Sequence, residues 1–137
     1  MSYLDILDAQ LIVDEGDRNK PYVDSRGNVS IGIGRNLTGI GISDDEKALM
    51  YANDRARADA TARALFPTFD ALTDNRKAVV LNMAFNIGQA TLSKFHATIE
   101  AVTSGDYDGA AEDMLASAWA GQVGARATRL ADLMRSG

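Results

Sequence analysis

Two neighbouring stretches decide the fold of this chain: Val13-Asp14-Glu15-Gly16, and Tyr22-Val23-Asp24-Ser25-Arg26-Gly27-Asn28-Val29-Ser30-Ile31-Gly32-Ile33-Gly34. In the second stretch, apolar residues at 29, 31 and 33 alternate with serine or glycine, which is the period of two typical of a β-strand. The turn-forming residues 24–28 precede this strand. The stretch predicts a β-hairpin or a small three-stranded sheet, with Val29, Ile31 and Ile33 on its apolar side. Ser30 then faces the other way, beside glycines that leave room for a ligand to approach the backbone.

Helices are predicted for most of the remaining chain. Residues 2–14 repeat leucine at helical spacing, between a capping box at Ser2 and a terminating Gly16. A second capping box, at Ser43, opens a long helix that runs to about Leu65. Further helices are predicted over residues 73–88, 91–104, 107–118 and 124–135, and the first of these is apolar on most sides. The fold class is therefore α+β and mostly α.

Composition narrows the classes of function. The 137 residues suit one domain, and the absence of cysteine excludes disulfide frameworks and thiolate chemistry. A single histidine, His96, leaves little scope for histidine-based zinc or triad chemistry. The formal net charge of -5 argues against nucleic-acid binding as the main activity. The chain shows no signal peptide and no apolar run of the roughly 20 residues that a spanning helix needs, so we expect no stable membrane association.

Two carboxylates, Glu15 and Asp24, carry the chemistry that the residues themselves suggest. Glu15 lies at the predicted C-terminal end of the first helix, where the helix dipole disfavours the charged form and raises the pKa, as burial in a cleft also would. A raised pKa suits a general acid, while Asp24, in a polar turn, stays ionised. Such a pair is typical of glycosidic bond cleavage, in which one group donates a proton and the other activates a water, here held by Ser30. On spacing alone, the same residues also fit an Asx-turn aspartate and a solvated helix end.

The local sequence adds a family resemblance to this argument. From Glu15 onward the chain reads Glu, eight residues, Asp, five residues, Ser, and then Ile-Gly-Ile-Gly. This pattern resembles the active-site stretch of the phage-type lysozymes, glycoside hydrolase family 24, in which threonine stands at the position of Ser30. Residues 76–88 resemble the central helix of that family, and Phe95, Trp119 and residues 122–129 resemble its C-terminal lobe. The resemblance covers essentially the whole chain, in order.

The resemblance implies a lysozyme-like fold of two lobes within a single domain, residues 1–137. The implied parts are an N-terminal lobe over about 15–45, a connecting helix over about 44–65, and a helical C-terminal lobe over about 66–137 together with helix 2–14. The cleft of the family lies between the two lobes. The connector from Leu37 to Ser43 is shorter than in the familiar relatives, which predicts a smaller N-terminal lobe.

The resemblance also implies a muramidase that cleaves the β-1,4 bond between N-acetylmuramic acid and N-acetylglucosamine with inversion. Glu15 is then the general acid, Asp24 the carboxylate that activates or positions water, and Ser30 the hydroxyl that holds this water. The implied substrate-binding residues are Phe85, Asn86, Gln122 and Arg126, with Arg126 near the acid. Phe85 equally fits core packing, and Trp119 fits the core better than a sugar platform. No metal or organic cofactor is implied.

Two departures from the family pattern carry predictions. Ser30 keeps the hydroxyl of the family's threonine but lacks the methyl group that restricts its rotamers, so we expect activity to survive at a reduced level. Arg35 stands where the family often has a histidine that pairs with an aspartate on the long helix. Since Asp54 occupies the position of that aspartate, the sequence predicts a permanently charged Arg35–Asp54 salt bridge.

The biological role that we expect is bacterial cell-wall lysis by a phage or prophage. The partners are peptidoglycan glycan strands, and the protein acts as a monomer. It accumulates in the host cytoplasm until a holin or delivery on a virion brings it to the periplasm and the wall. The acidic charge makes steering toward an anionic wall weak, which favours action at a high local concentration, for example on a virion. The alternative is a non-catalytic or weakly active glycan-binding virion component with the same fold.

Overall fold

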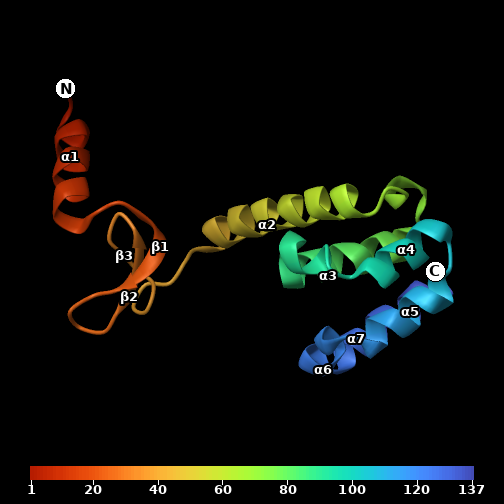
Figure 1. Ribbon diagram of the computed structural model, residues 1–137. Coiled ribbons are helices and arrows are strands. Elements are labelled where there is room, and N and C mark those ends of the chain that lie inside the picture. Colours follow the sequence, from red (N-terminus) through yellow and green to blue (C-terminus); the bar gives the residue numbers. More distant parts are fainter. The chain divides into compact units, whose positions relative to one another are not determined.

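The computed structural model describes all 137 residues, and the chain divides into two compact units, Met1–Leu49 and Met50–Gly137. The first unit contains helix α1 (Tyr3–Glu15), strands β1 (Arg18–Val23), β2 (Val29–Gly32) and β3 (Arg35–Asn36), and the start of helix α2 (Asp44–Leu65) (Figure 1). The second contains the rest of α2, the short 3-10 helix η1 (Phe69–Ala71), and helices α3 (Asp74–Leu92), α4 (His96–Ser104), α5 (Tyr107–Ala116), α6 (Ala118–Val123) and α7 (Ala125–Ser136). The predicted fold class, α+β and mostly α, is confirmed.

The three strands form one antiparallel sheet in the order β1-β2-β3. Ser30, in the middle strand, lies opposite Tyr22 on β1 and Asn36 on β3. The strand predicted to run through residue 33 ends earlier, because Gly32 and Gly34 take positive φ angles and turn the chain back into β3. Ile33 therefore lies in the turn and is 49% exposed, so the predicted apolar stripe is not a buried face. Ser30 is the buried residue of this unit, at 5% exposure.

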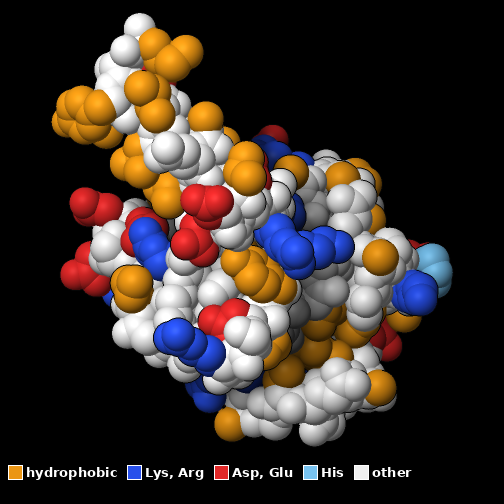
Figure 2. All heavy atoms as spheres, turned by 90° about the vertical axis from the view of Figure 1, so that its left-hand side faces the viewer, with side chains coloured by type: hydrophobic (Ala, Val, Ile, Leu, Met, Phe, Trp, Pro, Cys, Tyr) orange, Lys and Arg blue, Asp and Glu red, His pale blue; other side chains and the backbone are white.

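Helix α1 begins and ends as its sequence predicts. The Ser2 side chain accepts a hydrogen bond from the Asp5 backbone N–H, and the Asp5 carboxylate accepts one from the Ser2 N–H, which completes the capping box. Gly16 terminates the helix at a φ of +85°. Hydrophobic side chains are exposed along α1, and none of its residues is buried (Figure 2, top). By its contacts α1 belongs to the first unit, and its membership of the helical lobe stays a prediction.

Helix α2 also follows its local signals. Ser43 and Glu46 form the predicted capping box, in which each side chain accepts a hydrogen bond from the other's backbone N–H. The helix ends at Leu65, two residues before Pro67. Its first turn is acidic, which complements the positive end of the helix dipole.

The second unit holds the hydrophobic core. Helix α5 packs against α4 and α7, and α7 also contacts α3 and α6. The largest fully buried side chains are Phe66, Met83, Leu92, Met114, Met134, Val79, Val80 and Val102. Trp119 is 3% exposed and belongs to this core, as the sequence favours.

Two helices of the second unit differ from those that the sequence predicts. The sequence marks the end of the third helix at 86–88, and Gly88 is indeed non-helical, but helical turns resume at once and the element runs to Leu92. Helix α6 was not predicted; the Ser117 side chain caps it by accepting a hydrogen bond from the Ala120 N–H. None of the helices combines the length and the apolar composition needed to span a bilayer.

Candidate active site

Glu15 is the last residue of α1, and its position is fixed at the backbone. The Tyr22 hydroxyl donates a hydrogen bond to the Glu15 carbonyl oxygen at 3.3 Å, and the Arg18 guanidinium lies 4.6 Å from the centre of the Tyr22 ring. Gly16 then turns the chain toward β1. The Glu15 side chain is exposed, so the first unit does not itself provide the burial expected for a general acid.

Asp24 occupies the turn between β1 and β2. Its Oδ1 accepts hydrogen bonds from the backbone N–H groups of Arg26 at 2.8 Å and Asn28 at 2.9 Å, and its own N–H donates to the Asn28 carbonyl at 2.8 Å. These donors, Asn28 first, hold the pKa of Asp24 below its ordinary value because they stabilise the ionised form. The hydrogen bonds that form the Asx turn therefore also favour the ionised carboxylate. The interpretation of Asp24 as a turn residue and its interpretation as an ionised catalytic group are compatible.

Ser30 lies on the same side of the sheet as the end of α1. Residues that face each other across antiparallel strands project their side chains to one face, and Ser30 faces Tyr22. The Tyr22 hydroxyl reaches the backbone of Glu15, and Asp24 follows Tyr22 by two residues, in the turn just beyond the end of β1. The first unit thus contains all three residues: Glu15 and Ser30 are linked through Tyr22, and Asp24 lies in the adjoining turn.

The two glycines beside Ser30 differ in the space that they leave. A Cβ atom built on Gly32 meets no atom within 4 Å, so this position is open, as expected. A Cβ atom built on Gly34 would meet the side chain of Glu15. The space beside Gly34 is therefore filled by the predicted acid and does not serve a ligand.

Arg35 and Asp54 each pair with a residue of their own unit, and the Arg35–Asp54 pair stays a prediction. Arg35 Nη1 binds Glu46 Oε1 at 2.8 Å and donates a hydrogen bond to the Gly41 carbonyl at 3.2 Å, while Asp54 pairs with Arg57 at 2.9 Å. The Glu46 carboxylate is already oriented by the Ser43 capping box, which presents it to the end of β3. Arg35 first, then the Ser43 N–H, lower the pKa of Glu46 to about 2.

Phe85 and Arg126 share a pocket in the second unit. The Phe85 side chain is 49% exposed, so it is not a core residue, and its ring lies 6.2 Å from the ring of Tyr51. Arg126 donates two hydrogen bonds to Asn82 Oδ1, at 2.9 and 2.7 Å. All four residues line a pocket of about 340 Å³, and Phe85 also lines a neighbouring one of about 430 Å³.

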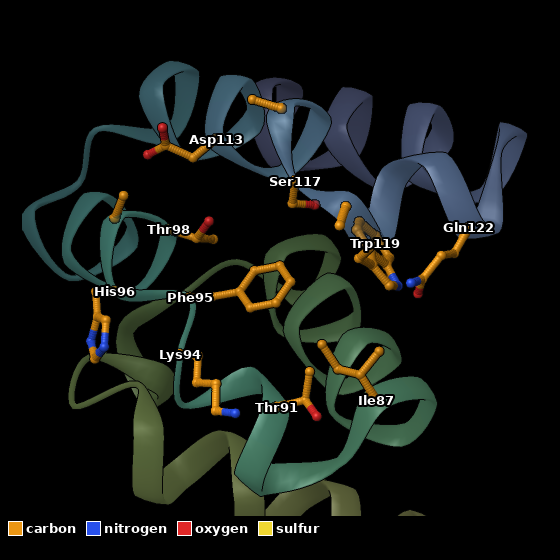
Figure 3. Close-up of a pocket in the computed structure, with 13 residues that line it drawn as sticks. Ile87, Thr91, Lys94, Phe95, His96, Thr98, Asp113, Ser117, Trp119 and Gln122 are labelled. Atoms are coloured by element: carbon orange, nitrogen blue, oxygen red, sulfur yellow. The ribbon is translucent and has the colours of Figure 1, made fainter.

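Asn86 and Gln122 are grouped around Trp119 instead. The Trp119 Nε1–H donates a hydrogen bond to Asn86 Oδ1 at 2.8 Å. Trp119 and Gln122 lie at one end of a third pocket, of about 490 Å³, into which Phe95 points (Figure 3). Phe85 and Arg126 therefore line one pocket of the second unit and Gln122 lines another, while Asn86 lies beside the second pocket through its bond to Trp119.

Four contacting residues were missed by sequence reasoning: Tyr22, Gly34, Tyr51 and Asn82. For Asn82 a signal existed, since it precedes Phe85 by three residues and so shares a helix face with it. For Tyr22 and Tyr51 no local pattern distinguishes a site residue from an ordinary surface aromatic. No three histidine, aspartate or glutamate side chains lie close enough together to hold a metal ion.

Comparison with known families decides the class of this arrangement. The family model described as phage lysozyme matches residues 13–135. The chain belongs to the phage lysozyme family. Membership makes the protein a lysozyme-like peptidoglycan hydrolase, and hence a glycosidase by class. The predicted roles of the individual site residues stay predictions.

Two relatives illustrate the range of this family. Over 90% of its length the chain is 26% identical to a protein named probable T4-type lysozyme 2 from Dictyostelium discoideum, of which it covers 90%. It is also 26% identical, over 90% of its length, to the pre-baseplate central spike protein of Enterobacteria phage T4, of which it covers 26%. The alignments extend over 153 and 152 positions, more than the 137 residues of the chain, so each relative contains residues that this chain lacks.

Proposed function

We propose that this protein is an inverting muramidase that cleaves the β-1,4 bond between N-acetylmuramic acid and N-acetylglucosamine. The observation that carries the proposal is that Glu15, Asp24 and Ser30 belong to one compact unit, in which Tyr22 links the end of α1 to the strand that holds Ser30. Family membership supports the substrate class, because the phage lysozyme match includes all three residues.

The two carboxyl groups take opposite roles. Glu15 donates its proton to the leaving glycosidic oxygen. Asp24 stays ionised, and because both turn N–H groups bind its Oδ1, its Oδ2 is left to accept a proton from the attacking water. The Ser30 hydroxyl orients this water. Inversion requires a separation of about 6.5–9.5 Å between the two carboxyl groups, so that the water fits on the face opposite the leaving group.

Glycan binding is assigned to the second unit. Phe85 offers a half-exposed ring to a sugar, and Arg126, held by Asn82, offers charged N–H donors in the same pocket. Asn86 and Gln122 supply amide groups beside Trp119. Aromatic faces and fixed polar donors are the usual means of holding a ligand in a largely apolar pocket.

The test is the hydrolysis of purified peptidoglycan, measured as the release of reducing ends. We expect Glu15→Gln and Asp24→Asn to abolish activity without changing the circular dichroism spectrum, and Ser30→Thr to equal or exceed the wild type. Asp17→Asn is the matched control, because this exposed carboxylate lies between the two proposed catalytic ones in the sequence. An active Glu15→Gln variant would refute the assignment of the acid. Product anomers followed by NMR decide between inversion and retention.

The biological role that we propose is cell-wall lysis by a phage or prophage, by a monomer that is stored in the host cytoplasm and released by a holin. A second candidate, a virion component, is favoured by the matched segment of a phage pre-baseplate spike protein and by the acidic net charge. Mass spectrometry of purified virions separates these roles. A protein that binds peptidoglycan but releases no reducing ends would support the non-catalytic alternative.

A further inference from the structure

The β2–β3 turn lies directly against the side chain of Glu15. A Cβ atom added to Gly34 would stand 2.8 Å from Glu15 Cβ, 2.9 Å from its Oε2 and 3.0 Å from its Cγ. Non-bonded carbon atoms pack at about 3.5–4.0 Å, so a side chain at position 34 would have to displace Glu15. The backbone of Gly34 thus forms one wall of the space in which the Glu15 side chain lies.

Hydrogen bonds hold the backbone in place on both sides of this contact. The residue after Gly34 is Arg35, whose guanidinium binds both Glu46 and the Gly41 carbonyl and so ties β3 to the start of α2. On the other side, the Tyr22 hydroxyl holds the Glu15 carbonyl oxygen. The nearest atom is the Cβ of Glu15, which moves only with its backbone. Because the backbone is anchored at both residues, an added Cβ would strain both segments and shift the Glu15 carboxyl group together with them.

Gly32 provides a comparison within the same turn. Gly32 and Gly34 have nearly equal φ angles, +67° and +69°, in the left-handed region that side chains of L-residues disfavour. Alanine at either position therefore meets a similar backbone penalty. Only at Gly34 does the added methyl group also meet Glu15, because nothing lies within 4 Å at Gly32.

We propose that Gly34 is a positioning residue, which sets the direction in which Glu15 presents its proton to the glycosidic oxygen. The inference rests on the proposed function, in which Glu15 is the general acid. Gly34 does not contact the substrate in this proposal. It acts through Glu15, because the absence of a side chain at position 34 leaves the space that the Glu15 side chain occupies. General acid catalysis needs the donor within hydrogen-bond reach of the leaving oxygen, and a misplacement of about 1 Å can lower a rate about a hundredfold.

The experiment compares Gly34→Ala, Gly32→Ala and Glu15→Gln with the wild type on two substrates. One is a soluble peptidoglycan fragment, and the other is a fragment whose leaving group is dinitrophenolate, which departs without being protonated. On the natural fragment we expect Gly34→Ala to lower kcat by about 10- to 100-fold with KM within about twofold. Gly32→Ala should stay within about threefold of the wild type. On the dinitrophenyl fragment both glycine variants should stay close to the wild type.

A purely structural role for Gly34 would not separate the two substrates. Equal kcat values for the two glycine variants would overturn the proposal, and so would an equal loss on the dinitrophenyl fragment. If Glu15→Gln is inactive and Gly34→Ala is not impaired, the positioning role of Gly34 is refuted, while the proposed role of Glu15 as the acid stands. If Glu15→Gln is fully active on the natural fragment, the proposed function fails and the positioning role with it.

A stability measurement keeps the proposal testable if Gly34→Ala folds poorly. The contact with Glu15 predicts that Gly34→Ala lowers the thermal midpoint more than Gly32→Ala does. In a Glu15→Gly background, where no side chain is met, this difference should disappear. A difference that persists in that background would overturn the proposal, because the added methyl group would then be meeting something other than Glu15.

Discussion

Arg76 on α3 ties down the C-terminal end of α7, and its replacement should weaken the second unit. Its Nε donates a hydrogen bond to the Met134 carbonyl at 2.8 Å, and its Nη2 donates one to the Arg135 carbonyl at 2.9 Å. The guanidinium carbon also lies 3.6 Å from the centre of the Tyr107 ring on α5. The last carbonyl groups of a helix have no partners within that helix and form the negative end of its dipole, so a cation is favourable there. One side chain therefore joins three helices.

The magnitude follows from these contacts. A hydrogen bond to a charged group contributes about 1.5–3 kcal/mol, and a cation–π contact at a partly exposed site about 0.5–1 kcal/mol. Water can reach the carbonyl of the exposed Arg135 and replace part of this loss. We therefore expect Arg76→Met, which keeps an apolar stem, to lower the unfolding free energy by about 2–4 kcal/mol. For a chain of this length that corresponds to a fall of roughly 6–15 °C in Tm.

Thermal and urea unfolding followed by circular dichroism measure this effect. Arg129→Met, at an exposed position on α7, is the matched control and should change stability by less than about 0.5 kcal/mol. Arg76→Lys should fall between the wild type and Arg76→Met, because lysine keeps the charge but cannot bind both carbonyls with a rigid fork. Equal Tm values for Arg76→Met and Arg129→Met would refute the reasoning.

Three further predictions concern charge and the glycan, and a fourth concerns the hydrophobic core. Because the turn N–H groups lower the pKa of Asp24 from its ordinary 3.8, the acidic limb of the kcat/KM profile should lie below pH 3.8, and a limb near pH 5 would contradict its role as the base. Arg35 and the capping box lower the pKa of Glu46 from 4.5 to about 2. The Tm advantage of the wild type over Glu46→Gln should therefore be full above pH 4.5 and shrink as the pH falls toward 2. An advantage that stays constant over this range would count against the Arg35–Glu46 pair. Phe85→Ala should raise KM about three- to tenfold, as expected for a lost contact of roughly 1 kcal/mol, with little change in Tm. In contrast, Phe66→Ala should cost about 3–5 kcal/mol of stability, because that ring is fully buried.

Local signals predicted most of the secondary structure. The capping boxes at Ser2 and Ser43, and the Thr73 cap of α3, each act between residues three positions apart, so the sequence alone defines where those helices begin. Gly16 ends α1 for the same reason, because a glycine can take the positive φ that the helix end requires. The alternating pattern also predicted the central strand, although not the residue at which it turns.

The candidate site is only partly a local matter. Glu15, Asp24 and Ser30 lie within 16 consecutive positions, and their spacing across a helix end and a hairpin was enough to nominate them. Their surroundings were not predictable in the same way. The sequence suggested Asp54 as the partner of Arg35, but Glu46 lies closer along the chain and is already oriented by its capping box.

The sequence by itself determined most of the helices and strands and pointed to three candidate catalytic residues. Both depend on backbone preferences and spacings over a few neighbouring positions. The tertiary structure decided which side chains meet: Trp119 with Asn86, Arg126 with Asn82, and the carboxyl group of Glu15 with the bare backbone of Gly34. Each of these contacts joins residues 19 or more positions apart, beyond the reach of the local backbone preferences that set helix and strand ends. They arise only when the elements pack, since packing selects partners by shape and distance rather than by order along the chain.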